Sequence, residues 1–122
     1  MTLSVGYRSI LRVKSLTYKR LVKVAVVGGN NLRVDDKTVS TIQMSLDGLN
    51  ADEVIVTGAG GASLAGEIAA SNLGVPNVLM SGAKLLERAS VLIALPGGAT
   101  TRNYVKMFKD ANKKVVEIEV GK

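Results

Sequence analysis

From Val22 onward, the chain alternates between short apolar runs and segments in which apolar residues recur at helical spacing. The runs are rich in β-branched residues, have the length of strands, and several end at glycine, which is typical of buried strands that enter turns. Five such runs are found, at residues 22–29, 52–58, 76–82, 90–98 and 113–120. The pattern therefore predicts five strands.

The segments between these runs predict helices. In the first, either Asp35 or Asp36 can cap the amino end, and the apolar positions Val39, Ile42, Leu46 and Leu49 follow, with Gly48 near the end. The second passes through Leu64, Ile68 and Leu73 and ends at Gly74, which suits a left-handed cap, just before Pro76. A short helix over residues 83–89 comes next. The last carries Tyr104, Met107, Phe108 and Ala111 on one face.

Strands that alternate with helices at this spacing indicate right-handed crossovers and a parallel sheet covered on both faces. The chain is thus predicted to be a small doubly wound α/β protein with about five strands. A length of 122 residues fits one domain with a substantial core. We place that domain at residues 22–122, preceded by a separate segment, residues 1–21.

Composition narrows the chemistry that is available. The sequence has no cysteine and no histidine, which excludes disulfides, thiol nucleophiles, histidine bases and the usual zinc sites, so no metal site is expected. No stretch approaches the roughly 18 apolar residues of a membrane span. We expect a soluble protein without a membrane partner, and the lack of a signal peptide and of cysteine favours the cytoplasm.

The net charge of +6 is concentrated at one end of the chain. Residues 1–23 hold six basic residues and no acidic one, whereas basic and acidic residues balance from residue 24 onward. The basic residues are Arg8, Arg12, Lys14, Lys19, Arg20 and Lys23. Residues 1–21 are therefore a basic N-terminal arm, which resembles a transit peptide in composition. Docking on its own domain or on a second subunit, or contact with nucleic acid or another anionic surface, would each give it a role.

Three glycine-rich loops follow predicted strands, at residues 28–31, 58–63 and 96–103. Ligands of open parallel sheets bind beyond the carboxyl ends of the strands, so the three loops are expected to face one crevice. Glycine lets backbone amides approach an anion closely, and each following helix offers unpaired N–H groups. The predicted ligand is a phosphate or another anion. The candidate binding residues are Gly28, Gly29, Asn30, Gly58, Gly60, Gly61, Ser63, Gly97, Gly98, Thr100, Thr101 and Arg102.

Arg102 strengthens this prediction because a cation in the first turn of a helix is disfavoured by the helix dipole unless an anion is bound there. Simpler roles stay open for Arg102, which can lie solvated on the helix surface, and for the neighbouring residues. Thr100 or Thr101 can cap the last helix, and Ser63 can cap the second. Asn30 and Asn31 can serve turn geometry alone.

Acidic residues offer little for catalysis. Glu67, shortly after the second glycine loop, is a weak candidate whose placement near the start of a helix is explained equally well by the helix dipole. The other acidic residues fall at predicted caps, strand ends and polar faces. No pair is placed convincingly for acid–base work.

The stretches VAVVGGNN, TGAGGASLAGEIAA and LLERASVLIALPGGATTRNYVKMFKDANKKVVEI resemble the SLOG superfamily of Rossmann-like proteins, from Val24 onward. That group includes the "lysine decarboxylase"-like phosphoribohydrolases known as LOG proteins, the molybdenum-cofactor carrier and the DNA-processing protein. ALPGG followed by a threonine-rich helix start carries most of the likeness. The resemblance implies a nucleotide, a nucleotide-derived signal, or a phosphate-bearing cofactor such as a molybdenum-cofactor-like ligand.

The sequence departs from the enzymes of that group at their catalytic positions. Tyr104 stands where their glutamate falls, Gly82 aligns with their arginine, and Thr100 and Ser63 replace glycines. We therefore expect ligand binding without catalysis. Two alternatives are a nucleoside monophosphate phosphoribohydrolase, with Glu67 or a partner's carboxylate as the acid, and nucleic-acid binding through residues 8–23. A thin sheet with exposed edges also favours a homodimer.

Overall fold

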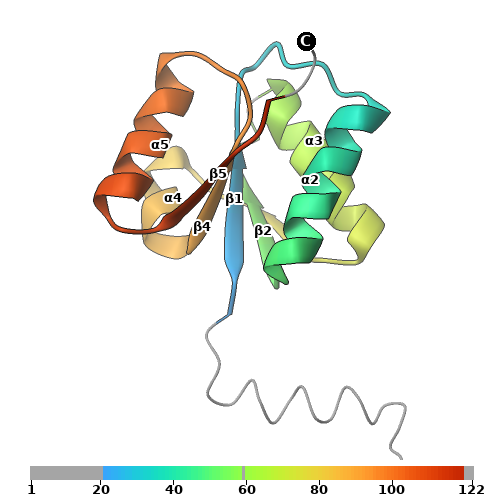
Figure 1. Cartoon of the computed structure of the whole chain (residues 1–122), viewed down its shortest axis with the longest axis horizontal. Helices are drawn as coiled ribbons and strands as arrows, with labels where there is room; N and C mark the ends of the chain where they lie inside the picture. Colours follow the sequence, from blue (N-terminus) through green and yellow to red (C-terminus); the bar gives the residue numbers. More distant parts are fainter. Residues whose placement is uncertain (1–20, 59, 120–122) are drawn as a thin grey trace, which may run out of the picture.

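The computed structural model describes residues 21–58 and 60–119, and these form a five-stranded, all-parallel sheet with helices on both faces (Figure 1). The predicted α/β class is confirmed. The elements are β1 (Lys23–Val27), α2 (Asp36–Leu49), β2 (Glu53–Val56), α3 (Gly60–Leu73), β3 (Asn77–Leu79), α4 (Gly82–Arg88), β4 (Val91–Ala94), α5 (Ala99–Asp110) and β5 (Lys114–Glu117). Among the described residues, no helix is both long enough and apolar enough to cross a membrane. Apart from Leu21, the predicted basic arm lies outside the described residues.

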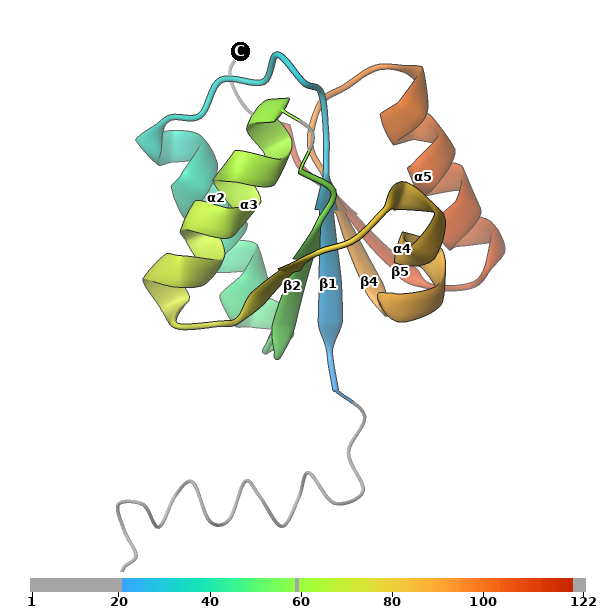
Figure 2. The ribbon, with the colours of Figure 1, turned by 180° about the vertical axis from the view of Figure 1, so that it is seen from behind.

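The strand order is β3-β2-β1-β4-β5, so β1 lies at the centre. Its Ala25 is in register with Ile55 of β2 on one side and with Leu92 of β4 on the other. The order of the strands reverses at β1, and the two helix pairs accordingly cover opposite faces, α2 with α3 and α4 with α5 (Figures 1 and 2). The point of reversal lies between β1 and β4, where open α/β sheets bind their ligands.

Both faces of β1 are buried, which explains its unbroken apolar run. Val24 and Val26 are fully buried in the core beneath α2 and α3, whereas Ala25 and Val27 belong to the core beneath α4 and α5. The single phenylalanine, Phe108, is fully buried in the second core. The alternation of side chains along a strand thus serves two separate cores.

Helix α3 buries a different face from the one its leucines suggested. Leu64 is 49% exposed and Leu73 is 37% exposed. The buried positions are small residues: Ala62, Ser63, Ala65, Gly66, Ala69 and Ala70. A Cβ on Gly66 would lie only 3.1 Å from Val26 Cβ and 3.3 Å from Val56 Cγ1, so small side chains allow α3 to pack directly on the sheet.

The predicted face of α5 is also partly wrong. Tyr104 and Phe108 do pack in the core beneath α4 and α5, but Met107 is 41% exposed and Ala111 is exposed. Val105 takes part in the core in their place.

Two predicted caps are confirmed. Asp35 caps α2, and its carboxylate accepts a hydrogen bond of 2.9 Å from the Thr38 N–H. That bond, together with one from the Thr38 hydroxyl, holds the pKa of Asp35 below its ordinary value. Gly74, just after α3, has φ +72°, the left-handed conformation in which glycine is favoured.

Candidate functional site

A hollow of about 430 Å³ lies at the carboxyl ends of β1 and β4, at the point where the strand order reverses. The loops that follow these two strands lie at the top of the view in Figure 1. The described residues that line the hollow are Gly28, Gly29, Asn30, Thr57, Gly98, Ala99, Thr100, Thr101 and Tyr104. They come from the loop after β1, the end of β2 and the first turns of α5.

The loops after β1 and β4 are held together by close backbone contact. The Gly29 N–H donates a hydrogen bond of 2.9 Å to the Pro96 carbonyl. A Cβ on Gly28 would lie 2.9 Å from the Cβ atoms of both Ala62 and Leu95, and one on Gly97 would lie 2.7 Å from Gly29 N. These glycines are therefore required by packing, whatever else they do.

The amino end of α5 borders the hollow. Gly98 is its N-cap, and no side chain caps the helix. The first hydrogen bond of the helical type runs from Arg102 N–H to the Gly98 carbonyl at 3.1 Å. The N–H groups of Ala99, Thr100 and Thr101 thus have no acceptor within the helix, and with the helix dipole they favour a bound anion.

The two threonines are not caps, contrary to one of the predicted alternatives. Both lie inside α5, as its second and third residues. Thr100 is exposed beside the hollow, whereas Thr101 is only 7% exposed and its hydroxyl lies close to Gly97. An exposed hydroxyl of Thr100 is available to a ligand.

The second glycine loop builds the site rather than lining it. Gly61 N–H donates a hydrogen bond of 3.1 Å to the Asn30 carbonyl, and Gly60, at φ +71°, packs its Cα against the Asn30 backbone. Gly58 N–H donates to the Ser63 hydroxyl at 2.9 Å. Ser63 is the fourth residue of α3, so it is not the N-cap that was considered. Gly58, Gly60, Gly61 and Ser63 are not among the described residues that line the hollow.

Arg102 also lies outside this lining. It is exposed, and it borders a separate hollow of about 490 Å³ together with Glu117 and Glu119, on the side of α5 that faces β5. Arg102 therefore borders a different depression from the one that meets the amino end of α5.

Acidic side chains are not part of the described lining. Glu67, in the second turn of α3, does not border the hollow. Within residues 21–58 and 60–119, no group of three acidic residues could hold a metal ion. Hydroxyls, one amide and backbone groups make up the polar part of this site.

Three lining residues, Thr57, Ala99 and Tyr104, are not among the predicted candidates, although Ala99 falls within the predicted loop at residues 96–103. Thr57 directly follows the buried part of β2, and its position next to Gly58 is a signal that could have identified it. Tyr104 was assigned to the core. It lies there in part, with its hydroxyl against Gly82 of α4, but it also borders the hollow one helical turn after Thr100 and Thr101.

No protein-family model matches this chain, and no curated protein matches it.

Proposed function

We propose that this protein binds a small ligand carrying a phosphate or a similar anion in the hollow between β1 and β4. The observation that carries the proposal is the amino end of α5, which has no side-chain cap and whose first N–H groups, without acceptors in the helix, border a hollow at the point of strand reversal. Anions bind at such helix ends because the N–H groups and the dipole act together.

The size and polarity of the hollow favour a ligand larger than phosphate itself. Its volume of about 430 Å³ lies within the range of roughly 300–1,000 Å³ that is usual for small-molecule sites. The Tyr104 hydroxyl and the Asn30 amide offer hydrogen bonds to a sugar or a base. A nucleotide, a nucleotide-derived signal or a phosphate-bearing cofactor fits this description, in agreement with the resemblance to the SLOG superfamily.

Binding without turnover is the favoured activity. Cleavage of an N-glycosidic bond needs a general acid or base near the leaving group. The described lining supplies no carboxylate for this role, and Glu67 lies elsewhere on α3.

The decisive variant is Thr100→Asp. A carboxylate in the first turn of α5 should stabilise the helix by about 0.3–1 kcal/mol through the dipole. It should also repel an anionic ligand from the same N–H groups. We expect Thr100→Asp to melt at or above the wild-type temperature and yet to lose at least tenfold in affinity, so lost binding cannot be caused by unfolding.

Isothermal calorimetry and thermal shift against inorganic phosphate, ribose 5-phosphate and the common nucleoside monophosphates provide the measurement, with adenosine as the uncharged comparison. Thr100→Asn, which is neutral, should bind within threefold of the wild type, as should Arg102→Ala. If no phosphate-bearing compound stabilises the wild type, or if Thr100→Asp binds equally well, the proposal fails. Release of free base from the nucleotides would show that the protein hydrolyses its ligand and does not only bind it.

A further inference from the structure

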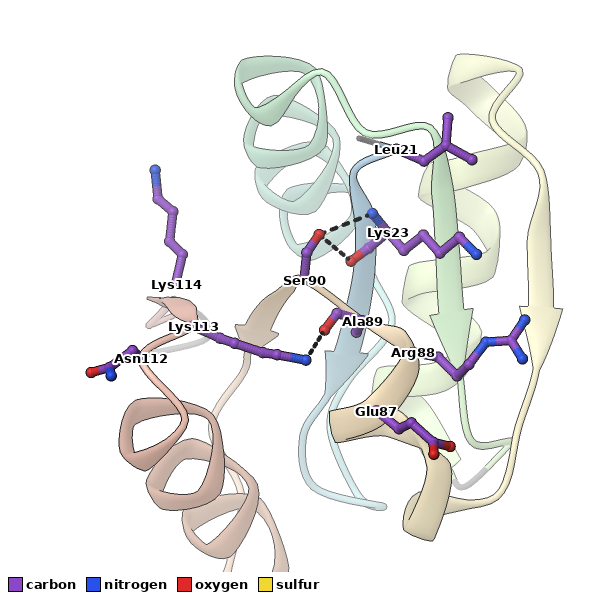
Figure 3. Close-up of a pocket in the computed structure, with 9 residues that line it drawn as sticks. All are labelled: Leu21, Lys23, Glu87, Arg88, Ala89, Ser90, Asn112, Lys113 and Lys114. Atoms are coloured by element: carbon purple, nitrogen blue, oxygen red, sulfur yellow. Dashed lines mark hydrogen bonds between the residues drawn. The ribbon is translucent and has the colours of Figure 1, made fainter. Parts of the chain in front are cut away.

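A second hollow, of about 570 Å³, lies at the opposite edge of the sheet, where the strands begin (Figure 3). Its described lining is Leu21, Lys23, Glu87, Arg88, Ala89, Ser90, Asn112, Lys113 and Lys114. The Ser90 hydroxyl holds the start of β1, since it accepts from Lys23 N–H at 3.2 Å and lies 3.3 Å from the Lys23 carbonyl. This side chain therefore ties the start of β4 to the start of β1.

Four cations border this hollow, and one of them already has a structural role. The Lys113 ammonium donates to the Ala89 carbonyl at 2.8 Å and to the Leu86 carbonyl, both at the end of α4. In Figure 3 its side chain points toward α4, whereas Lys114 extends away from that helix. Lys23, Arg88 and Lys114 are then the cations that can meet an external anion.

These three cations come from β1, α4 and β5 and are spread across the edge of the sheet. Lys114 is in register with Val91 of β4, which is in register with Val24 of β1. At about 4.8 Å per strand, the backbone at Lys114 is about 10 Å from the start of β1. One strand of B-form DNA carries about three phosphates over that length. The spacing suits a polymer of phosphates better than a single small anion.

Acidic groups reduce the positive charge of the edge without cancelling it. Glu87 borders the hollow, and Glu53 lies 4.0 Å from the Lys23 ammonium, a separation at the limit of an ion pair. The Asp52 carboxylate accepts a 2.7 Å hydrogen bond from Val22 N–H and is engaged there.

The basic arm joins the domain at this hollow, because Leu21 is part of its lining. The twenty residues before Leu21 include Arg8, Arg12, Lys14, Lys19 and Arg20 and no acidic residue. A polymer that contacts Lys23 and Arg88 therefore lies next to Leu21, and the five further cations precede that residue in the sequence.

We infer that Lys23, Arg88 and Lys114 form a binding surface for nucleic acid. Cations on several elements of a shallow surface match the repeating phosphates of a strand, and such contacts position a nucleic acid without reading its sequence. A membrane surface is less favoured, because insertion at the interface needs apolar side chains. Leu21 is the only large apolar residue in the described lining.

The test compares two triple variants of the full-length chain. K23Q/R88Q/K114Q removes the three cations from the amino edge. K37Q/K84Q/R102Q removes two lysines and one arginine from exposed positions near the starts of α2, α4 and α5, at the carboxyl edge, so both variants lose the same charge. Fluorescence anisotropy with a labelled 20-nucleotide RNA and a 20-base-pair DNA gives the affinity at several salt concentrations.

We expect the amino-edge variant to bind at least tenfold more weakly and the carboxyl-edge variant to stay within threefold of the wild type. The slope of log K against log salt for the RNA should fall by about 2, the value for three lost phosphate contacts on a single strand. E87Q, which removes an exposed acid from the same edge, should strengthen binding a few-fold. Equal losses in both triple variants, or no binding by the wild type, overturn the inference. So does binding to phosphatidylserine vesicles at a salt concentration where neither oligonucleotide binds.

Discussion

Replacing Lys113 by methionine tests how the second half of the sheet is held to its helices. The ammonium of Lys113 donates to two carbonyls at the end of α4, and it lies 5.8 Å from the centre of the Phe108 ring. Methionine keeps an unbranched apolar side chain of similar length, so packing on Phe108 is largely retained. The substitution removes the charge and both hydrogen bonds.

The expected loss follows from these contacts. Hydrogen bonds to a charged group contribute about 1.5–3 kcal/mol. Because Lys113 is partly buried, water can compensate for only part of this energy when the ammonium is removed. Ala89 is 1% exposed with Lys113 in place, and a methionine side chain at this position would cover its carbonyl without donating a hydrogen bond to it. The cation–π contact adds about 0.5–1 kcal/mol. We expect Lys113→Met to lower the free energy of unfolding by about 2 kcal/mol, or roughly 8–16 °C in melting temperature for a domain of this size.

Urea denaturation followed by far-UV circular dichroism measures this loss. The slope of the free energy of unfolding against urea concentration should be the same in both proteins if unfolding is two-state. Lys106→Met is the matched control. Lys106 is 76% exposed and its pair with Asp110, at 3.4 Å, is an exposed i,i+4 pair, so the loss should stay below about 0.5 kcal/mol. If the two variants are equally stable, Lys113 does not hold α4 in place, and the account of this edge of the sheet is wrong.

Four further single substitutions test one helix cap and the space around three glycines. The lowered pKa of Asp35 means that its carboxylate stabilises the fold fully above the unfolded-state pKa and loses this effect as the pH falls through the folded-state value. Asp35→Ala should therefore melt below the wild type at pH 7, and melting curves at decreasing pH should show the difference disappear. Gly82→Ala places a methyl group against the Tyr104 hydroxyl, so it should cost about 1–2 kcal/mol in urea denaturation, and adding Tyr104→Phe should recover part of that loss. Gly61→Ala directs a methyl group into a backbone carbonyl and should cost about 1–3 kcal/mol, whereas Gly48→Ala, which meets nothing within 4 Å in the last turn of α2, should stabilise by up to about 0.5 kcal/mol.

The strands were predictable because parallel strands bury both faces. Val24 to Val27 form an apolar run with no polar alternation, and the structure places these residues in two cores. The apolar face of α3 was not predictable in the same way. Alanine and glycine carry little hydrophobic signal, yet they form the buried stripe because close packing on the sheet excludes larger side chains. Leu64 and Leu73 dominate the pattern and are exposed.

The candidate site shows a similar limit. Glycine follows three strands, and the sequence cannot distinguish a glycine that admits a ligand from one that admits another loop. Gly61 is packed against the backbone of the loop after β1, whereas a Cβ on Gly98 would meet nothing within 4 Å. Arg102 lies in the first turn of α5, as predicted, but the hollow that it borders depends on how α5 lies on the sheet, which the sequence does not reveal.

The two hollows differ in the sign of the charge that the helix dipoles favour there, because the helices in this fold run antiparallel to the strands they cover. Helix amino ends therefore gather at the carboxyl edge of the sheet and helix carboxyl ends at the amino edge, where cations are favoured by the dipoles alone. Lys113 has this structural role at the end of α4. If Lys23, Arg88 and Lys114 had the same role, their triple substitution would lower the melting temperature as Lys113→Met does. If they bind nucleic acid instead, the triple variant keeps a melting temperature close to that of the wild type and loses affinity, whereas Lys113→Met loses stability and keeps most of its affinity at temperatures where it is folded. The pair of measurements separates cations that hold the fold together from cations that face a partner.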